Sequence, residues 1–515
     1  LSSELTVLAN MLDYIAETSR YTRDFTLNGL RDALIEVVAC FPVYRTYVTG
    51  ERVSTEDRRY VDWAIAQAKK RSPAGETTIF DFVRSILLDG VNDPDDGHRL
   101  RATRFVMKFQ QYTAPVMAKA LEDTAFYIYN RLISLNEVGG DPRRFGVSVA
   151  AFHRSNLDRV QHWPRAMTAT STHDAKRSED VRARINVISE MADEWQHHLV
   201  RWSRSNRTRK VWVDGVPAPS RNDEYLIYQT LLGAWPLETE NSGALENFRE
   251  RAKGYLLKAV KEAKVHTSWV NSNLGYEEAT ARFVEQILGT PEQNAFLNDF
   301  IPFQKKTARF GLLNSLSQTL LKLASPGVPD TYQGMELWQF HLVDPDNRRP
   351  VNYPRHRELL TALKEQFDRL EPSEVLRELQ VTIEDGRAKL LLTCRALQLR
   401  RQWPELLGQG EYIPLNCGGR KAEHLCAFAR RHKDAVLVAV APRWFARLSQ
   451  GGLTLPLPAD LWADTYVELA PLGNSGVFTD TLGQRQLRAH GGRLAAADLF
   501  AHFPVALLLR APQSQ

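Results

Sequence analysis

The sequence predicts an α/β protein that also contains all-α segments and ends in an all-β domain. Apolar residues recur at helical spacings through roughly the first 110 residues. Two short apolar runs, "TAPVMAK" (113–119) and "RAMTATSTHD" (165–174), end in polar residues, and a helical pattern follows each, as is typical of a βα unit. After about residue 380 the pattern alternates between turn residues, which predicts β-strands.

The length and composition are those of a globular protein with several cores. At roughly 150 residues per domain, 515 residues predict two to four domains. The hydrophobic content is 43% and the net charge is only +5, with Lys and Arg scattered along the chain. This charge pattern does not favour a nucleic-acid partner, and the basic stretch "RSNRTRK" (204–210) is expected to be a solvated loop.

Cysteine usage favours a reducing compartment. Cys40, Cys394, Cys417 and Cys426 are widely spaced and form no C-x-x-C motif, so we expect reduced thiols in a cytoplasmic protein rather than disulfides or a zinc site. The sequence has neither an apolar run of membrane-spanning length nor a secretory signal at its start. Leu1 in place of Met suggests that residue 1 is not the natural start.

The helical segments have recognisable stripes and caps. The first segment has apolar residues at helical spacings, and a second stripe follows: Leu1, Leu5, Leu8, Leu12, Ile15; Phe25, Leu27, Leu30, Leu34, Val37, Val38. "STED" (54–57) has the pattern of a capping box. In "RNDEYLIYQTLLGAW" (221–235), Asn222 or Asp223 is expected at the N-cap of another helix.

The segment "TSTHDAKRSED" (170–180) places His173 and Asp174 directly after a predicted strand. The helical period resumes at Val181 and Ile185, so the pair lies in a loop between strand and helix. Catalytic groups of β/α barrels lie in such loops. Taken alone, a His-Asp pair is more often structural, with the imidazole bonded to a carbonyl and the Asp capping a helix. The position after a strand favours a functional role.

A second segment, "PGVPDTYQGME" (326–336), has the more specific spacing G-x-P-x-x-Y-x-G-x-E. Gly327, Pro329 and Gly334 are expected to shape a tight turn, which is compatible with a functional role. Together the two segments resemble the alpha-amylase superfamily. Longer motifs narrow the resemblance to the maltooligosyl trehalose synthases: "EDTAFYIYNRLISLNEVGGDP" (122–142), "TSTHDAKRSEDVRARI" (170–185), "NDEYLIYQTLLGAWP" (222–236), "KVHTSWVNSN" (264–273) and "LVDPDNRRPV" (342–351).

The resemblance implies a partial (β/α)8 barrel that contains only the late strands. Five parts are expected along the chain: a helical insertion module (1–112), late barrel βα units with the His-Asp loop (113–200), a helical insertion (201–310), the last barrel strand and helix (311–375), and a C-terminal β-domain (376–515). The implied reaction converts the reducing-end α-1,4 link of a maltooligosaccharide into the α-1,1 link of maltooligosyl trehalose. No cofactor, metal, nucleic acid or membrane is implied.

The carboxylates that such a reaction needs are not evident in the sequence. The superfamily uses an Asp in a G-x-R-x-D motif as nucleophile and a Glu on the next strand as general acid. In "NGLRDAL" (28–34), Arg31 and Asp32 are adjacent and lie in a helical pattern, so they are expected to be solvated helix residues. Glu122, Asp123 and Glu137 lie in family motifs, but not in that of the acid. The chain is therefore expected to be a C-terminal portion that needs an N-terminal barrel portion as its partner.

The resemblance assigns roles to several residues. Asp174 is expected to be the third carboxylate of the site, accepting hydrogen bonds from sugar hydroxyls, and His173 to donate to the same sugar. Lys176, Arg177, Glu179 and Asp180 either contribute to acceptor subsites or form an exposed first helical turn. Tyr332 either stacks on a sugar or packs in the turn, and Trp269 and His266 either line the pocket or lie in the core. Asp344, Asp346 and Arg349 either hold a loop by ion pairs, which we favour, or touch the terminal glucose.

Two other functions fit the same residues. The chain could be part of another alpha-amylase superfamily hydrolase or transferase, although the long motifs argue against this. It could also be a non-catalytic glucan-binding or assembly portion, which the missing carboxylates favour.

Overall fold

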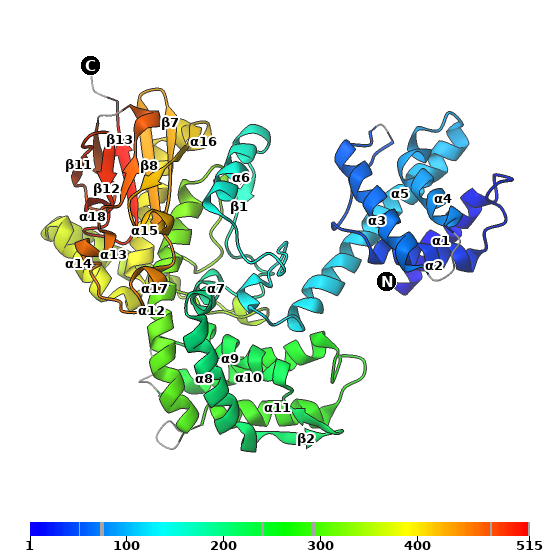
Figure 1. Cartoon of the computed structure of the whole chain (residues 1–515), viewed down its shortest axis with the longest axis horizontal. Coiled ribbons are helices and arrows are strands. Elements are labelled where there is room, and N and C mark those ends of the chain that lie inside the picture. Colours follow the sequence, from blue (N-terminus) through cyan, green and yellow to red (C-terminus); the bar gives the residue numbers. More distant parts are fainter. Residues whose placement is uncertain (51, 73–76, 238–241, 290–293, 474–475, 513–515) are drawn as a thin grey trace. The chain divides into compact units, whose positions relative to one another are not determined.

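The computed structural model describes residues 1–50, 52–72, 77–237, 242–289, 294–473 and 476–512 (Figure 1). The chain divides into two compact units, Leu1–Tyr127 and Ile128–Gln515. Each unit has its own buried apolar residues and is described by itself.

The first unit is helical. It contains α1 (Ser2–Ala16), α2 (Leu27–Ala39), α3 (Thr55–Arg71), α4 (Thr78–Leu88) and α5 (Asp96–Met117). Leu8, Leu12 and Leu34 are completely buried in one core with Phe105 of α5, so the predicted helical stripes are confirmed. The predicted cap is also present, because the Ser54 hydroxyl accepts a hydrogen bond from the backbone N–H of Asp57. Arg31 and Asp32 are exposed on α2, as expected.

Residues 113–119 are helical, and the prediction of a strand there is wrong. They form the end of α5 and the start of a π-helical turn, Ala118–Glu122. Phe105, Phe109 and Thr113 are spaced by four residues and are all buried, so they continue one helix face to the end of α5. The short apolar run is the last turn of this face, interrupted by Pro115.

The second unit contains two short parallel strands, β1 (Met167–Thr168) and β4 (Val328–Pro329), in which Met167 pairs with Val328 and Thr168 with Pro329. The helices around and between them are α6 (Val149–His162), α7 (Glu179–Asn186), α8 (Ala192–Ser205), α9 (Arg221–Ala234), α10 (Ser242–Ala263), α11 (Leu274–Ile287) and α12 (Ala295–Ala324). A hairpin, β2 (Val211–Val213) and β3 (Val216–Ala218), precedes α9. In Figure 1, α12 runs from the lower helices to the C-terminal sheet.

Two local expectations in this unit need correction. The N-cap of α9 is Ser220, whose hydroxyl accepts from the backbone N–H of Asp223, so neither Asn222 nor Asp223 is the cap. Asp223 is instead buried in the first turn and accepts a hydrogen bond from the Tyr276 hydroxyl. The stretch 204–210 is not all loop, because it includes the end of α8 and a 3-10 turn, Arg207–Arg209.

The C-terminal region is a β-sheet region preceded by helices. The helices are α13 (Tyr353–Arg369), α14 (Pro372–Val381), α15 (Arg387–Gln402) and α16 (Pro404–Gly408), so the sheet begins at Glu411 and not near residue 376. The main antiparallel sheet has the order β11-β10-β13-β8-β7-β5. Its strands are β5 (Glu411–Leu415), β7 (Leu425–His432), β8 (Ala435–Pro442), β10 (Val477–Asp480), β11 (Gln486–Arg488) and β13 (Ala506–Arg510).

A smaller antiparallel sheet completes this region. It has the order β12-β9-β6, with β12 (Arg493–Ala495), β9 (Tyr466–Glu468) and β6 (Cys417–Gly418). The strands predicted after residue 430 are therefore confirmed. Every residue of β8 is buried, since this strand packs against α12 as well as its neighbours in the sheet.

Cys40, Cys394, Cys417 and Cys426 are free thiols. Across the described ranges, we find no helix with the length and apolarity needed to cross a membrane. The same ranges contain no group of three or more His, Cys, Asp or Glu side chains arranged to hold a metal ion.

Candidate functional site

The two sequence motifs meet at the carboxyl ends of β1 and β4. These strands are parallel, with backbone hydrogen bonds of 2.9 Å from Val328 N to Ala166 O and 2.8 Å from Asp330 N to Thr168 O. The loop after β1 carries His173 and Asp174. Because parallel neighbours end at the same edge of a sheet, the segment after β4 starts beside this loop.

Tyr332 and Asn347 connect the two motifs. The Tyr332 hydroxyl donates to the Asn347 carbonyl over 3.1 Å, and the Asn347 amide donates to the His173 carbonyl over 2.9 Å. Gly334 lies in the turn that follows Tyr332, and its φ angle of +82° disfavours residues with a Cβ atom. Gly327, with a φ angle of +108°, lies in a bend before β4, and Pro329 belongs to β4. The expected turn is therefore confirmed for Gly334, whereas Gly327 and Pro329 lie outside it.

The side chains of His173 and Asp174 are accessible. His173 is exposed, and the Asp174 side chain is 46% exposed, with one carboxylate oxygen 3.4 Å from the Lys176 ammonium. Asp174 does not cap the following helix, since the N-cap of α7 is Ser178. The imidazole is therefore exposed and the carboxylate about half-exposed, and the alternative in which Asp174 caps a helix is not realised. A sugar-binding role for the pair stays a prediction.

Glu137 holds the next part of the loop. Its two carboxylate oxygens accept hydrogen bonds from the backbone N–H groups of Lys176 at 2.7 Å and Arg177 at 3.2 Å. Arg177 is only 1% exposed, and its guanidinium donates to Tyr255 Oη over 2.5 Å and to the Ile133 carbonyl over 3.2 Å. Lys176 is 3% exposed. Both basic residues are thus part of the packed base of the loop.

Glu179 and Asp180 are buried, so the alternative of an exposed first turn is wrong. Their side chains are at most 1% exposed, and both contact Lys389 of α15 at 2.7–3.0 Å. Burial would raise the pKa of Glu179, but the charges of Lys389 and Lys322 lower it to about 2. Burial and the neighbouring Glu179 raise the pKa of Asp180, although Lys389 opposes this shift. The carboxylates stabilise the start of α7 and are not available as subsites.

Ion pairs hold the segment 342–349, as expected. Asp346 accepts two hydrogen bonds of 2.8 Å from Arg251, and its carboxylate also accepts from the backbone N–H of Leu342. Arg349 is 3.0 Å from the same carboxylate, and Lys258 is 2.8 Å from Asp344. Burial would raise the pKa of Asp346, but the hydrogen bonds and charge of Arg251 lower it.

Trp269 and His266 are not brought to this loop. They lie in the segment between α10 and α11. The Trp269 side chain is 56% exposed, with the Lys261 ammonium 4.9 Å from its ring, and His266 stacks on Tyr276 at 4.5 Å. Within the described part of the chain, neither contacts His173 or Asp174. A pocket role for them stays a prediction.

Comparison with known proteins adds an independent observation. No family model matches the chain. Two putative maltooligosyl trehalose synthases of Mycobacterium tuberculosis strains are each 38% identical to it over 407 residues, which is 78% of this chain and 45% of the relative. The maltooligosyltrehalose synthase structure from Arthrobacter ramosus is 34% identical, with a TM-score of 0.78, covering 99% of this chain and 56% of that one.

The chain is a relative of the maltooligosyl trehalose synthases. A hypothetical maltooligosyl trehalose synthase of Sulfolobus tokodaii, 28% identical with a TM-score of 0.66, is also similar over 98% of this chain and 58% of that one. The chain spans about half the length of the curated relatives it matches. This share is consistent with the C-terminal portion that the motifs predict.

Three residues that hold this loop have no role predicted from the sequence. Glu137 and Asn347 both lie in family motifs, Asn347 in "LVDPDNRRPV". Neither motif predicts the contact that the residue makes. A carboxylate within a family motif is the signal that could have marked Glu137. Lys389 lies 209 residues from Asp180 in an ordinary helical pattern, so no local signal marks it.

Proposed function

We propose that this chain is part of an enzyme that converts the reducing-end α-1,4 link of maltooligosaccharides into the α-1,1 link of maltooligosyl trehalose. The observation that carries the proposal is the presentation of His173 and Asp174 at the end of β1, next to the segment after β4. The relationship to maltooligosyl trehalose synthases over 78% of the chain supports the reaction type.

In this proposal, Asp174 and His173 bind the sugar that is transferred. A retaining transfer uses a carboxylate nucleophile and a carboxylic acid about 5–5.5 Å apart, and hydrogen bonds to ring hydroxyls that strengthen in the transition state contribute several kcal/mol. We place the nucleophile and the acid outside this chain. Asp174 accepts from the hydroxyls and His173 donates to them, so neither acts as nucleophile or general acid.

The neighbouring residues have supporting roles in the proposal. Lys176 is itself buried, so it is proposed to act on the acceptor subsites through the Asp174 carboxylate, 3.4 Å from its ammonium. Arg177 acts through its bonds to Tyr255 and the Ile133 carbonyl, which fix the loop. Tyr332 acts through Asn347, which bonds to the His173 carbonyl. Trp269 and His266 are proposed to contact more distant parts of the sugar chain.

We also propose that another polypeptide segment completes a β/α barrel next to β1 and β4. Parallel sheets are normally covered on both faces and contain more than two strands. Here Met167 is 73% exposed and Val328 is 49% exposed, although each is an apolar residue of a strand. The segment would supply the earlier strands with the two missing carboxylates.

The four free thiols favour a reducing compartment such as the cytoplasm.

Product analysis tests this function. The chain is incubated with maltopentaose alone, and then together with a polypeptide that corresponds to the remaining half of the relatives. We expect no conversion by the chain alone and a non-reducing product with an α-1,1 link from the mixture, measured by reducing-end assay and NMR. Release of shorter maltooligosaccharides would favour a hydrolase of the alpha-amylase superfamily. Binding of maltopentaose without any conversion by the mixture would favour a non-catalytic glucan-binding portion.

A further inference from the structure

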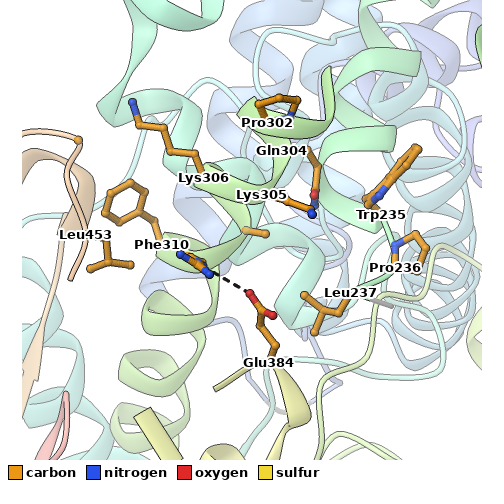
Figure 2. A pocket seen from close by; sticks show the side chains of 13 residues that line it. Trp235, Pro236, Leu237, Pro302, Gln304, Lys305, Lys306, Phe310, Glu384 and Leu453 are labelled. Atoms are coloured by element: carbon orange, nitrogen blue, oxygen red, sulfur yellow. Dashed lines mark hydrogen bonds and ion pairs between the residues drawn. The ribbon is translucent and has the colours of Figure 1, made fainter. Parts of the chain in front are cut away.

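The second unit contains a cavity of about 830 Å³ that none of the residues 170–180 lines. One wall is the α12 segment that carries Gln304, Lys305 and Arg309, and another is the chain just after α9, residues 235–237 (Figure 2). Glu384, after α14, and Leu453 of the C-terminal region complete the lining. This volume lies within the range of cavities that bind small molecules.

Gln304 supplies an unsatisfied hydrogen-bond donor in this lining. Gln304 is only 2% exposed, and none of the described residues provides an acceptor for its amide nitrogen. Leaving a buried amide unpaired costs about 1–3 kcal/mol, and most buried polar groups in proteins are paired. A turn of the Gln304 side chain toward the cavity would bring this donor to an acceptor on a bound ligand.

The charged residues of the lining are three cations, Lys305, Lys306 and Arg309, and one carboxylate, Glu384. Lys305 is exposed, and the described residues provide no ion-pair partner for it. Lys306 is neutralised by both oxygens of Glu194, at 3.0 and 2.9 Å. Arg309 is 3.4 Å from Glu384, the pair shown by the dashed line in Figure 2. The Glu384 carboxylate would repel a multiply charged anion. A hydroxyl group can donate to this carboxylate and also accept from a cation of the lining.

Packing against two aromatic rings holds Trp235, an apolar residue of the lining. Trp235 is 2% exposed, and its ring packs at 5.3 Å from that of Phe248 and 5.0 Å from that of Phe300. Pro236, Leu237 and Leu453 then give apolar surface at the cavity, against which the C–H groups of a sugar ring can pack. Apolar surface, unpaired donors and a carboxylate together match an uncharged polyhydroxylated ligand.

We infer that this cavity is a second carbohydrate-binding site that holds a segment of an α-glucan chain. The choice of an α-glucan rests on the proposed function, whereas the presence of a sugar site rests on the cavity itself. A glucan held here is bound by residues other than those of the His173 loop.

The test measures binding of maltotriose to the full 515-residue chain by isothermal titration calorimetry, together with the Tm of each variant. Gln304→Met keeps the volume and removes the unpaired amide, so we expect an unchanged or higher Tm with binding weakened tenfold or more. Glu384→Gln removes the charged acceptor and is expected to weaken binding to a similar degree. Glu365→Gln, an exposed carboxylate on α13 that does not line the cavity, is the matched control.

Asp174→Asn separates this inference from the proposed function. We expect it to leave the Gln304-dependent binding unchanged. If Asp174→Asn removes maltotriose binding while Gln304→Met retains it, the cavity inference is wrong and the proposed function stands. The inference is also overturned if wild-type chain does not bind maltotriose, or if inorganic phosphate displaces maltotriose from the Gln304-dependent site.

Discussion

The Lys389 ammonium lies 3.0 Å from both carboxylate oxygens of Asp180, with each side chain at most 1% exposed. The same ammonium is 2.7 Å from Glu179. Burial would lower the pKa of Lys389, but Asp180 and Glu179 raise it. One cation of α15 thus compensates two adjacent carboxylates at the start of α7, the helix that follows the His173 loop.

Replacing Lys389 with Met is expected to destabilise the chain strongly. The variant leaves two buried carboxylates without their shared partner, and breaking a buried ion pair from one side costs about 3–5 kcal/mol. Urea denaturation followed by circular dichroism measures the change. Arg369→Met serves as control, because Arg369 and Glu365 form an exposed pair with side-chain exposures of 77% and 58%. Such pairs contribute about 0–1 kcal/mol. Equal losses for the two variants would contradict the compensating role of Lys389.

The free energy of unfolding should depend on His341 between pH 6.5 and 4. Burial lowers the pKa of this imidazole from 6.5 to about 4. In this window the unfolded state binds a proton that the folded state does not, so stability is fully present above pH 6.5 and falls as the pH decreases. The loss reaches up to about 3 kcal/mol.

His341→Gln should therefore flatten the pH dependence of unfolding in this window. The measurement is urea denaturation at several pH values. His162→Gln is the control, because His162 is exposed on α6. A slope that is the same in wild type and in His341→Gln would show that the imidazole does not contribute.

Glu137→Gln should loosen the loop without unfolding the chain. The substitution replaces a carboxylate that accepts from two backbone N–H groups with an amide that has a single acceptor oxygen. We expect a loss of about 1–2 kcal/mol and hydrogen exchange of the Lys176 and Arg177 amides that is faster by roughly tenfold. Glu278→Gln on the exposed face of α11 is the control. Unchanged exchange at both amides would exclude Glu137 as the group that holds the loop.

Periodicity and local motifs predicted which segments are helices or strands better than they predicted the residues at which these elements begin and end. The spacing of Leu8 and Leu12 predicts a buried helix face, and the continuous apolar run in "AVLVAVAPR" (435–443) is typical of a buried strand such as β8, because both signals are local. The run at 113–119 was misassigned because a short apolar run has no period of its own and was separated from Phe105 and Phe109. Ser220 was missed because a cap depends on one hydroxyl, which several neighbouring residues could supply.

The sequence motifs predicted the candidate site, but they did not predict the residues that hold its loop in place. The positions of His173 and Tyr332 in two motifs were enough to expect them near each other. The burial of Glu179 and Asp180 was not predictable, since a charged first turn is usually solvated and Lys389 comes from a distant helix. Long-range ion pairs leave no local pattern in a single sequence.

The isolated chain should self-associate through the strands β1 and β4. Met167 and Val328 are 73% and 49% exposed, and an uncovered strand edge favours pairing with other chains. Sedimentation velocity should show concentration-dependent dimers or larger species. Met167→Lys places a charge on this edge and is expected to restore a monomer, whereas Val381→Lys, at an apolar residue of α14 that is 66% exposed, should not. A monomeric wild-type chain at all concentrations would argue against the uncovered edge as an association surface.

The strongest test of the proposed mechanism is Asp174→Asn in an active enzyme that contains this chain. The substitution keeps the shape and removes the charge, and bonds to a carboxylate are about twice as strong as those to a neutral acceptor. If these bonds strengthen as the sugar gains positive character, the loss falls on the transition state. We expect kcat to fall about 100-fold or more, which corresponds to about 3 kcal/mol, while KM changes little. The Tm should not change, because the Asp174 side chain is 46% exposed.

The control for this experiment must itself be accessible. Asp180→Asn is unsuitable, because it disturbs the buried contact with Lys389 and is expected to lower both stability and activity. Asp193→Asn, on the exposed face of α8, changes charge equally and should leave kcat and Tm unchanged. Steady-state kinetics on maltopentaose decide the matter. If Asp174→Asn retains near-normal kcat, or if it raises only KM, then Asp174 does not act as the third carboxylate of the reaction.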